Sequence, residues 1–406
     1  MIQKNNINKR WWILVAGVAT MLFAGIIYAW SILKTPFAQE LGYESSALAL
    51  NFTLTMCFFC LGGFISSRLI KLIGRRITII IAGISAGLGF ILTSFIGAGY
   101  PILLYITYSF LSGLGIGVAY IVIISTVNSW FPDRRGLSSG ALMMGFGAST
   151  LILGNIADAL FSSSVGWRNT YIIIGCAIAT VIVLSSFVIK APDENTVFPE
   201  KKKSSKASKE NFEVRDYTPS EMVRRFTFWR AFIALVCLTA VGSSVISFAR
   251  DLALSVGAQA SLATTLVGVL AVCNGLGRII TGAVFDSLGR KFTMISAGVL
   301  TIFAAGVTLI AVSISSLPLC IIGLCLTGLS YGTSPTVSSA FTSAFYGQKH
   351  FATNLSISNF NLMFASFIAT ACSSLQTASG GYTAPFILLL CLSGVALALN
   401  ISIKKP

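Results

Sequence analysis

The sequence has little charge and almost no histidine. Of its 406 residues, 10% are charged, 13 are acidic, and His350 is the single histidine. Soluble domains carry about 25% charged residues, so the two or three soluble domains that this length would allow could not be covered with polar surface. A disulfide framework and a metal site are also disfavoured, because all nine cysteines fall inside apolar runs and the pair Cys57 and Cys60 has no second pair.

The sequence also lacks the motifs that are typical of enzymes. The sequence shows no catalytic triad, no set of metal ligands and no glycine-rich phosphate loop. We therefore expect neither an enzyme nor a bound cofactor. The net charge of +15 could indicate nucleic-acid binding, but the basic residues sit in short gaps between apolar runs, as charges that flank lipid do. We therefore predict no nucleic-acid partner.

Apolar residues, by contrast, make up 55% of the chain. Runs of about 20 apolar residues are long enough to cross a bilayer, and in lipid they must be helical because each segment has to bond its own backbone groups. The runs fall at 11–33, 47–70, 77–97, 101–127, 137–162, 168–190, 228–249, 260–284, 292–313, 317–341, 353–377 and 382–403. The sequence thus predicts an all-α membrane protein with twelve transmembrane helices, of which the eleventh, rich in Asn and Ser, is the weakest.

The basic residues in the gaps predict the orientation. One set of alternate gaps is rich in Lys and Arg, whereas the other holds little beyond Lys34, Arg168 and Arg250. Positive charge stays on the cytoplasmic side, so we predict cytoplasmic N- and C-termini in a multi-pass protein of the cell (inner or plasma) membrane. The lipid bilayer is then its main partner, and no oligomer is required.

One long polar stretch, residues 191–227, carries five lysines among serines and acids. Such a composition cannot bury a core and predicts a flexible cytoplasmic linker. It separates an N-terminal six-helix bundle, residues 1–190, from a C-terminal one, residues 228–406. The end of the linker, from Thr218 to Arg225, has the pattern of a short capped helix at the membrane surface.

The two halves repeat one another. The segment Leu72-Ile73-Gly74-Arg75-Arg76-Ile77-Thr78 matches Ser287-Leu288-Gly289-Arg290-Lys291-Phe292-Thr293 at a shift of 215 positions, from 75 to 290. The same shift aligns Gly113-Leu114 with Gly328-Leu329. A constant shift at separate places indicates six spans, a linker and six further spans.

Here the chain resembles the major facilitator superfamily. Residues 282–291 (GAVFDSLGRK) are similar to that superfamily's loop signature between spans two and three, repeated between spans eight and nine. The resemblance implies a fold of two six-helix halves and a latch formed by Asp286 and Arg290, with Arg75 as the first-half counterpart of Arg290. The first-half copy departs from the pattern, because Ser67 and Lys71 stand where the glycine and the acid belong.

A second signature lies between spans four and five. Trp130-Phe131-Pro132-Asp133-Arg134-Arg135-Gly136, continuing to Gly145, resembles the monocarboxylate transporters and the related oxalate/formate antiporters. Tyr28-Ala29-Trp30-Ser31 and Trp229 also resemble the antiporter group, and the similarity runs along nearly the whole chain. It implies secondary active transport of a small organic anion, and we count Arg134 and Arg135 with the conformational residues.

One ionisable residue lies well inside a span. Arg278 stands seven residues before Phe285, the end of its run, which puts it about 10 Å deep at 1.5 Å per residue. A charge there is costly, and an arginine can hold a carboxylate with two parallel hydrogen bonds. Asn274, four residues earlier, shares its helical face. The residues alone equally allow an arginine bonded to carbonyls of another helix; the resemblance favours substrate binding, because both families carry a substrate-binding arginine at the matching place.

The antiporters also have a lysine in span eleven, so that two cations hold a dianion. At the matching position this sequence has Leu362, and no lysine or arginine occurs between His350 and the end of span twelve. One buried positive charge favours a monocarboxylate such as lactate, pyruvate, acetate or formate over oxalate. Span eleven offers Asn359 and Asn361, which we expect either to bind substrate or to bond neighbouring helices.

Aromatic and acidic residues complete the prediction. Tyr28, Tyr120 and Tyr331 match tyrosines near the family's cavity and are expected to line the site, whereas Trp30 could gate or merely pack. Asp158 and Asp251 are candidates for proton coupling if burial raises their pKa.

Coupling to a proton and exchange for a counter-anion both remain open. The alternatives are transport of another solute, such as a drug, a sugar or a larger organic acid, exchange of dicarboxylates of the oxalate/formate type, and a non-transporting sensor of organic anions.

Overall fold

The computed structural model describes residues 2–131, 135–192, 196, 215–347 and 349–403, and each regular element within them is helical. The first half comprises α1 (Ile2–Ala24), η1 (Gly25–Ala29), α2 (Trp30–Leu33), α3 (Thr35–Gln39), α4 (Ser45–Thr93), α5 (Pro101–Leu104), η2 (Tyr105–Gly113), α6 (Leu114–Ser129), α7 (Arg135–Ser149), η3 (Thr150–Gly154), α8 (Asn155–Phe161) and α9 (Gly166–Val188). After the linker follow α10 (Pro219–Val223), α11 (Phe226–Ser255), α12 (Ala260–Ser313), α13 (Leu317–Tyr346), α14 (Phe351–Ser358), α15 (Asn361–Ser379) and α16 (Thr383–Ser402).

The described chain contains 11 helical segments that are long and apolar enough to cross a membrane. One of them, α4, has 49 residues and would be about 73 Å long if straight, more than twice a hydrocarbon core of about 30 Å. It is interrupted at Gly74, whose φ of 78° lies in the left-handed region that glycine tolerates. Because α4 therefore holds two predicted spans, 47–70 and 77–97, the twelve predicted crossings are confirmed.

The predicted repeat reappears as a repeat of backbone conformation. The element α12 also joins two predicted spans, and it is interrupted at Gly289 with φ 77°. Gly74 and Gly289 differ by 215 positions, the shift found in the sequence. The two halves therefore turn at matching residues, which supports their origin as two copies of one six-helix unit.

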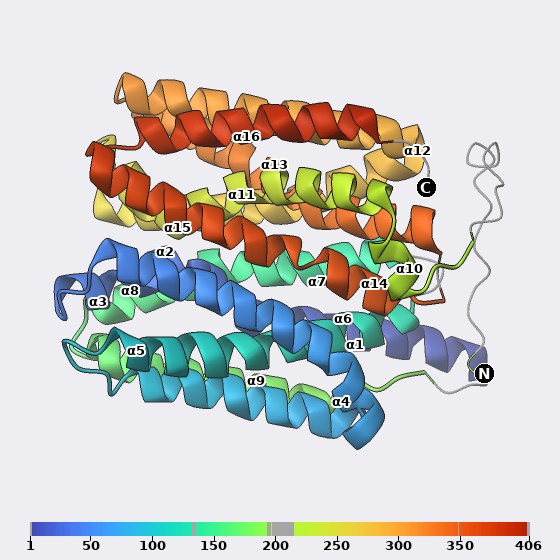
Figure 1. Ribbon diagram of the computed structural model, residues 1–406. Helices are drawn as coiled ribbons and strands as arrows, with labels where there is room; N and C mark the ends of the chain where they lie inside the picture. The colour runs from blue at the N-terminus through green and yellow to red at the C-terminus, as the bar shows by residue number, and fades with distance from the viewer. Residues whose placement is uncertain (1, 132–134, 193–195, 197–214, 348, 404–406) are drawn as a thin grey trace.

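The two halves lie side by side as bundles of roughly parallel and antiparallel helices (Figure 1). The start of α1, the end of α16 and the short α10 lie at one end of the molecule, here called the terminal end, and α3 lies at the other, here called the α3 end. Two ends of the chain on one side require an even number of crossings. Which side of the membrane the terminal end faces remains the prediction made from the basic residues, and the boundaries at 190 and 228 remain predictions as well.

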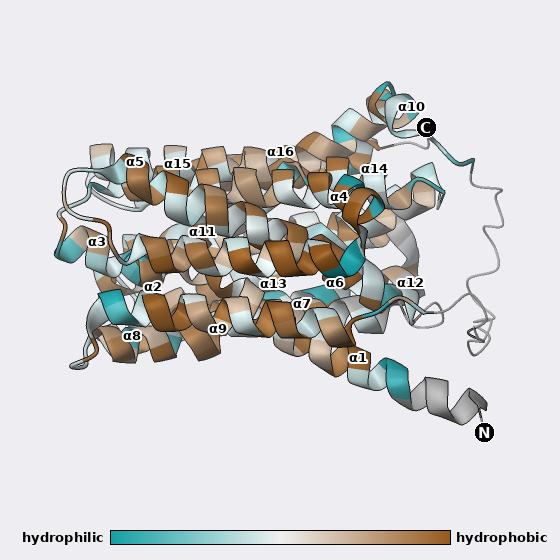
Figure 2. Ribbon diagram, turned by 90° about the horizontal axis from the view of Figure 1, so that it is seen from below, coloured by the Kyte–Doolittle hydropathy of each residue, from teal (hydrophilic) through white to brown (hydrophobic). Residues whose placement is uncertain are grey.

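Hydrophobic residues cover the lengths of the helices, while hydrophilic residues gather towards the two ends (Figure 2). Large apolar side chains such as Phe95, Phe303 and Leu184 are more than half exposed. In water such a surface would drive aggregation, but lipid accepts it without cost. The pattern is that of a membrane protein whose interior, not its perimeter, carries the polar groups.

Spans one and eleven are broken within the membrane region. Span one changes to the 3₁₀ segment η1 at Gly25, and a Cβ there would come within 2.0 Å of the Phe146 carbonyl oxygen. Span eleven, the weakest prediction, is split into α14 and α15 at Asn359 and Phe360. Broken helices at membrane depth occur where they line a site or pack inside the protein, and both breaks lie beside the residues described next.

Candidate functional site

The site is built on one face of α12. The two faces of this helix that flank Arg278 are closely packed: a Cβ at Gly275 would meet Met144 of α7, and one at Gly277 would meet the Leu329 backbone of α13. Asn274 and Arg278 share the face between them, one helical turn apart. They are 1% and 6% exposed. The close packing on both sides thus directs an amide and a guanidinium into the interior between the two halves.

The guanidinium of Arg278 has no hydrogen-bond or ion-pair partner among the described residues. Its Nε and Nη1 are buried and unpartnered, and so is Oδ1 of Asn274. An uncompensated buried charge is strongly destabilising. The bond to a carbonyl of another helix, which the sequence left open as an alternative, is not made within the described structure. The buried Nε and Nη1 of Arg278 therefore have hydrogen-bonding capacity that the described residues leave unused.

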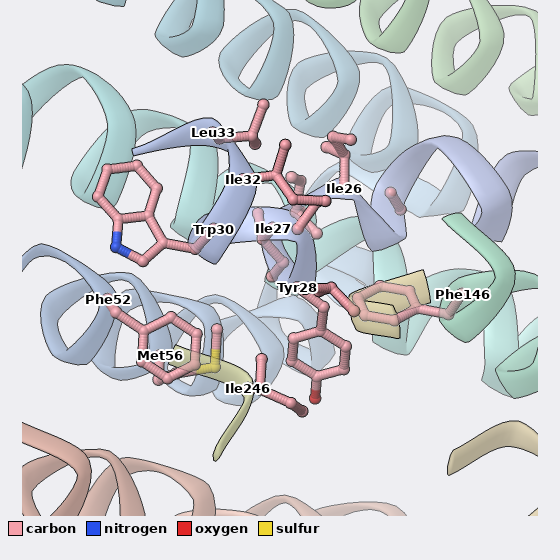
Figure 3. Packing of buried hydrophobic residues seen from close by; sticks show 14 of the residues in the cluster. Ile26, Ile27, Tyr28, Trp30, Ile32, Leu33, Phe52, Met56, Phe146 and Ile246 are labelled. Carbon is pink, nitrogen blue, oxygen red and sulfur yellow. The ribbon is translucent and has the colours of Figure 1, made fainter. Parts of the chain in front are cut away.

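Two tyrosine hydroxyls meet across the interface of the halves next to this charge. Tyr28 of η1 and Tyr331 of α13 lie with their hydroxyl oxygens 3.3 Å apart. The Tyr28 ring lies beside Phe146, and its hydroxyl points away from Ile26 and Ile27 (Figure 3). Tyr331 packs against the backbone of α11 at Gly242, where a Cβ would come within 2.2 Å of the ring. The break in span one and a glycine in span seven thus bring the two hydroxyls together.

Tyr120 belongs to an aromatic wall on the side of the first half. Its ring centroid lies 5.1 Å from that of Phe59 and 5.2 Å from that of Phe146, and Phe146 lies 5.2 Å from Tyr28. The charge of Arg278 interacts with Tyr28, Tyr120 and Tyr331. All three predicted tyrosines therefore lie near enough to the guanidinium to feel its charge. Phe59 and Phe146 were not predicted, because nothing in the sequence distinguishes them from the other phenylalanines of the spans.

The two asparagines of span eleven differ in their surroundings. Asn359 lines a cavity of about 10 Å³ together with Cys60, Tyr120 and other residues of α4 and α6, a volume that holds about one water. Cys60 Sγ also donates to the Asn359 carbonyl at 3.5 Å. Asn361 instead accepts from Thr239 at 2.9 Å and donates to the Ser358 carbonyl at 2.7 Å. Asn359 thus shares a small cavity with Tyr120, whereas the amide of Asn361 bonds α15 to α11 and α14, the second of its two predicted roles.

The charge of the site is a single positive one. Among the described residues three basic side chains are buried, Arg10, Arg250 and Arg278, and Arg250 has an acid beside it. Leu362 packs partly buried against the hydrophobic core. Trp30, which could have been a gate, is fully buried and donates its indole N–H to the Leu48 carbonyl at 2.9 Å. Its role in this conformation is packing.

The candidate coupling acids lie at the α3 end, away from Arg278. Asp251 of α11 accepts from Lys34 Nζ of the first half at 2.6 Å. Asp158 of α8 lies 3.8 Å from Arg250 of α11, and it accepts from Thr264 of α12 at 3.0 Å. Thr264 precedes Arg278 by 14 residues on α12, about 21 Å along the helix. Both acids therefore join the halves by ion pairs and do not contact the site.

The predicted latch is described only in part. Arg75 is exposed at the terminal end and forms no ion pair with the described residues. Asp286 and Arg290 belong to α12, and Arg135 begins α7, but their side chains are not among those described, and Arg134 lies outside the described residues. The latch thus stays a prediction.

Twelve crossings in two repeated halves around a buried, unpaired arginine define a membrane transporter. The chain matches the model of the Major Facilitator Superfamily over residues 13–250 and 231–405 and belongs to that family. It is a transporter and not an enzyme, as the sequence predicts.

Relatives and solved structures agree with this family. The chain is 27% identical to the oxalate:formate antiporter of Oxalobacter formigenes over 85% of this chain and 80% of that one. It is 25% identical to human monocarboxylate transporter 12, over 93% and 77% of the two chains. A bacterial homologue of the human lysosomal transporter Spinster, in an inward-facing and occupied conformation, superposes with a TM-score of 0.73 and 15% identity over 96% of each chain. The last comparison bears on the fold alone.

Proposed function

We propose that this chain is a secondary active transporter of small monocarboxylates and that Arg278 is the counter-ion of the carboxylate. One observation carries the proposal: a buried guanidinium whose Nε and Nη1 have no partner in the described structure and whose neighbours are three tyrosines. Carboxylates are the common biological anions with the planar geometry that a guanidinium binds. The names of two relatives, an oxalate:formate antiporter and a monocarboxylate transporter, support an organic anion.

The charge count favours an anion with one negative charge. In a medium of low dielectric constant, a monocarboxylate beside Arg278 leaves the site neutral, whereas a dianion leaves one uncompensated charge. A second cation from span eleven is not available, since Leu362 occupies the position expected for it. Oxalate-type exchange is therefore the less favoured alternative.

Transport would follow alternating access, with the two six-helix halves rocking around the midplane site. The tyrosine pair supports this scheme because Tyr28 comes from the first half and Tyr331 from the second. No acid of the described residues lies beside Arg278, so a proton taken up for symport would have to bind at a distance, at Asp158 or Asp251, or the substrate would exchange for a second anion.

Substitution of Arg278 tests the proposal. Hydrogen bonds to a charged group contribute about 1.5–3 kcal/mol each, and each 1.4 kcal/mol is a factor of about ten in affinity. Arg278→Gln is therefore expected to lower monocarboxylate uptake into proteoliposomes, at substrate concentrations below KM, by about 100-fold or more. Arg230→Gln, at a half-buried arginine of α11 whose guanidinium donates to the Ser402 carbonyl at 3.3 Å, is the matched control and is expected to leave uptake unchanged.

The same preparation separates the alternatives. Competition by carboxylates, but not by the corresponding amides or alcohols, is expected for the proposed function. Wild-type uptake by the Arg278→Gln variant would refute it, and competition by uncharged solutes would point to another substrate class. Binding of the anion without flux would indicate a sensor.

A further inference from the structure

Span nine carries a groove on its outer surface that the transport site does not use. The groove has a volume of about 470 Å³ and is lined by α12 between Phe292 and Phe303 and by Leu326 of α13. Phe292 and Phe303 are 54% and 65% exposed, so the groove opens outward and not into the interior between the two halves. On a transmembrane helix such a surface faces the lipid tails.

The lining of the groove excludes a polar ligand. Ser296 is the only one of the seven lining residues with a polar side chain, and its hydroxyl donates to the Thr293 carbonyl of its own helix at 3.0 Å. The stretch from Phe292 to Phe303 is about 16 Å long, which is close to half of a hydrocarbon core of about 30 Å. The groove therefore has the polarity and the length of one acyl chain in one leaflet of the bilayer.

A cation stands at one end of the groove. Lys291 precedes Phe292 and follows Gly289, where α12 turns at the terminal end of the molecule (Figure 1). The side chain of Lys291 is exposed and forms no ion pair or ring contact with the described residues. A lysine at this level extends its ammonium group to the lipid headgroups, where it attracts negative charge. The lipid whose chain fills the groove is therefore expected to have an anionic headgroup.

The first half, which repeats the second at a shift of 215 positions, has different residues at both places. Ile81, which is 52% exposed, stands at the position of Ser296, so that a large side chain occupies the place where the serine leaves room. Arg76 stands at the position of Lys291, and its guanidinium lies over the Phe187 ring at 4.3 Å. The small residue and the free cation thus occur together in one repeat and are both replaced in the other, whereas contact with bulk lipid requires neither.

We propose that the groove of span nine binds a phospholipid with an anionic headgroup, with one acyl chain along Ser296 and the headgroup at Lys291. Lipid tails are as apolar as the groove, so the chain contributes shape and the headgroup charge supplies the preference over other lipids. One lysine near an anionic lipid is expected to give a preference of about fivefold. The site lies outside the transport pathway, and its occupation requires neither Arg278 nor the substrate.

Photolabelling with lipid probes tests the proposal. The full-length protein is placed in phosphatidylcholine nanodiscs with a trace of phosphatidylglycerol or phosphatidylcholine that carries a photoreactive group in one acyl chain, and the labelled residues are located by peptide mass spectrometry. With the phosphatidylglycerol probe, labelling of 292–303 is expected to exceed that of the matching stretch 77–88 by about fivefold or more. Lys291→Gln is expected to lower this labelling about fivefold and to leave labelling by the phosphatidylcholine probe unchanged.

Ser296→Ile places the first-half residue in the groove and is expected to reduce labelling of 292–303 by both probes to the level of 77–88. Ser313→Ile, the same change at an exposed serine at the other end of span nine, is the matched control and should reduce neither. Equal labelling of the two stretches in the wild type would overturn the proposal and leave contact with bulk lipid only, and this comparison decides even if Ser296→Ile fails to fold. Equal labelling of 292–303 by the two probes would also overturn it, as would crosslinks at 292–303 between two copies of the chain, which would assign the groove to an interface.

Discussion

The ion pairs at the α3 end predict a conformational bias that can be measured. Neighbouring residues of α11, Arg250 and Asp251, pair with Asp158 and Lys34 of the first half, so that opposite charges cross the interface in both directions. All of these contacts must break for the α3 end to open. Removing one pair is therefore expected to shift the protein towards a state that is open at that end.

The magnitude follows from distance and exposure. Two unit charges 4 Å apart interact by about 4 kcal/mol at an effective dielectric constant of 20 and about 1 kcal/mol in water. The side chains of Lys34 and Asp251 are 15% and 43% exposed, and exposed pairs contribute about 0.2–1 kcal/mol when measured. We therefore expect about 1 kcal/mol for this pair, which corresponds to about a fivefold change in the ratio of closed to open protein.

Distances between spin labels on α3 and on the loop after α11 would report this ratio, with the labels attached through unnatural amino acids because nine native cysteines would compete. Asp251→Asn and Lys34→Met are each expected to raise the open population, and the double variant no further than either one. The swap of the two charges, Lys34→Asp with Asp251→Lys, should restore the closed state. Glu44→Gln is the control, because Glu44 is exposed near the α3 end and its side chain bonds only to Ser46 among the described residues. Additive single effects, or none, would refute the reasoning.

Two further predictions concern the site and the linker. Gly242→Ala would force the Tyr331 ring away from α11, at a cost of about 1–3 kcal/mol. The unfolding temperature in detergent and the rate of uptake should therefore both fall. Gly306→Ala, whose added Cβ meets nothing within 4 Å, should change neither. The pKa of Glu221 is lowered from 4.5 by the hydrogen bonds that it accepts from the backbone N–H and the hydroxyl of Thr218. The ionised Glu221 side chain therefore stabilises α10 fully above about pH 4.5, and this stabilisation is lost as the pH falls through the lowered pKa. Hydrogen exchange of the α10 amides should follow this pH dependence, and Glu221→Gln should remove it. The same pH dependence in the variant would count against the capping of α10 by Thr218 and Glu221.

Most of the fold could be predicted because its signals are local. The spans follow from hydropathy, and the turns at Gly74 and Gly289 follow from a repeated segment whose backbone needs glycine at one position. The breaks in spans one and eleven could not be predicted in the same way. Gly25 departs from the helix beside the backbone of Phe146, and this contact, between residues far apart in the sequence, leaves no pattern near Gly25.

The sequence predicted those site residues whose type is energetically costly inside a span, and it did not predict those whose type is common in every span. A charge inside a span is costly, so Arg278 stood out, and helical spacing added Asn274. The wall formed by Phe59 and Phe146 gave no signal, because phenylalanine is frequent in every span. For Asn361 the sequence allowed two roles, and only the positions of Thr239 and Ser358 show that its amide is bonded to neighbouring helices.

The division of the site between the halves has a consequence for coupling. The first half contributes neutral groups, Tyr28 and Tyr120 with their aromatic neighbours, whereas the second half contributes the single charge and the amide. On the proposed mechanism, the passage between open states requires both ends to close around Arg278. Closing around a lone guanidinium would bury an uncompensated charge, but closing around a guanidinium and a monocarboxylate would bury a neutral pair. The substrate itself then lowers the barrier to the occluded state, and return of the protein without an anion is slow. A transporter with these electrostatics favours the exchange of one monocarboxylate for another over net flux, unless a distant acid such as Asp251 or Asp158 changes the charge balance.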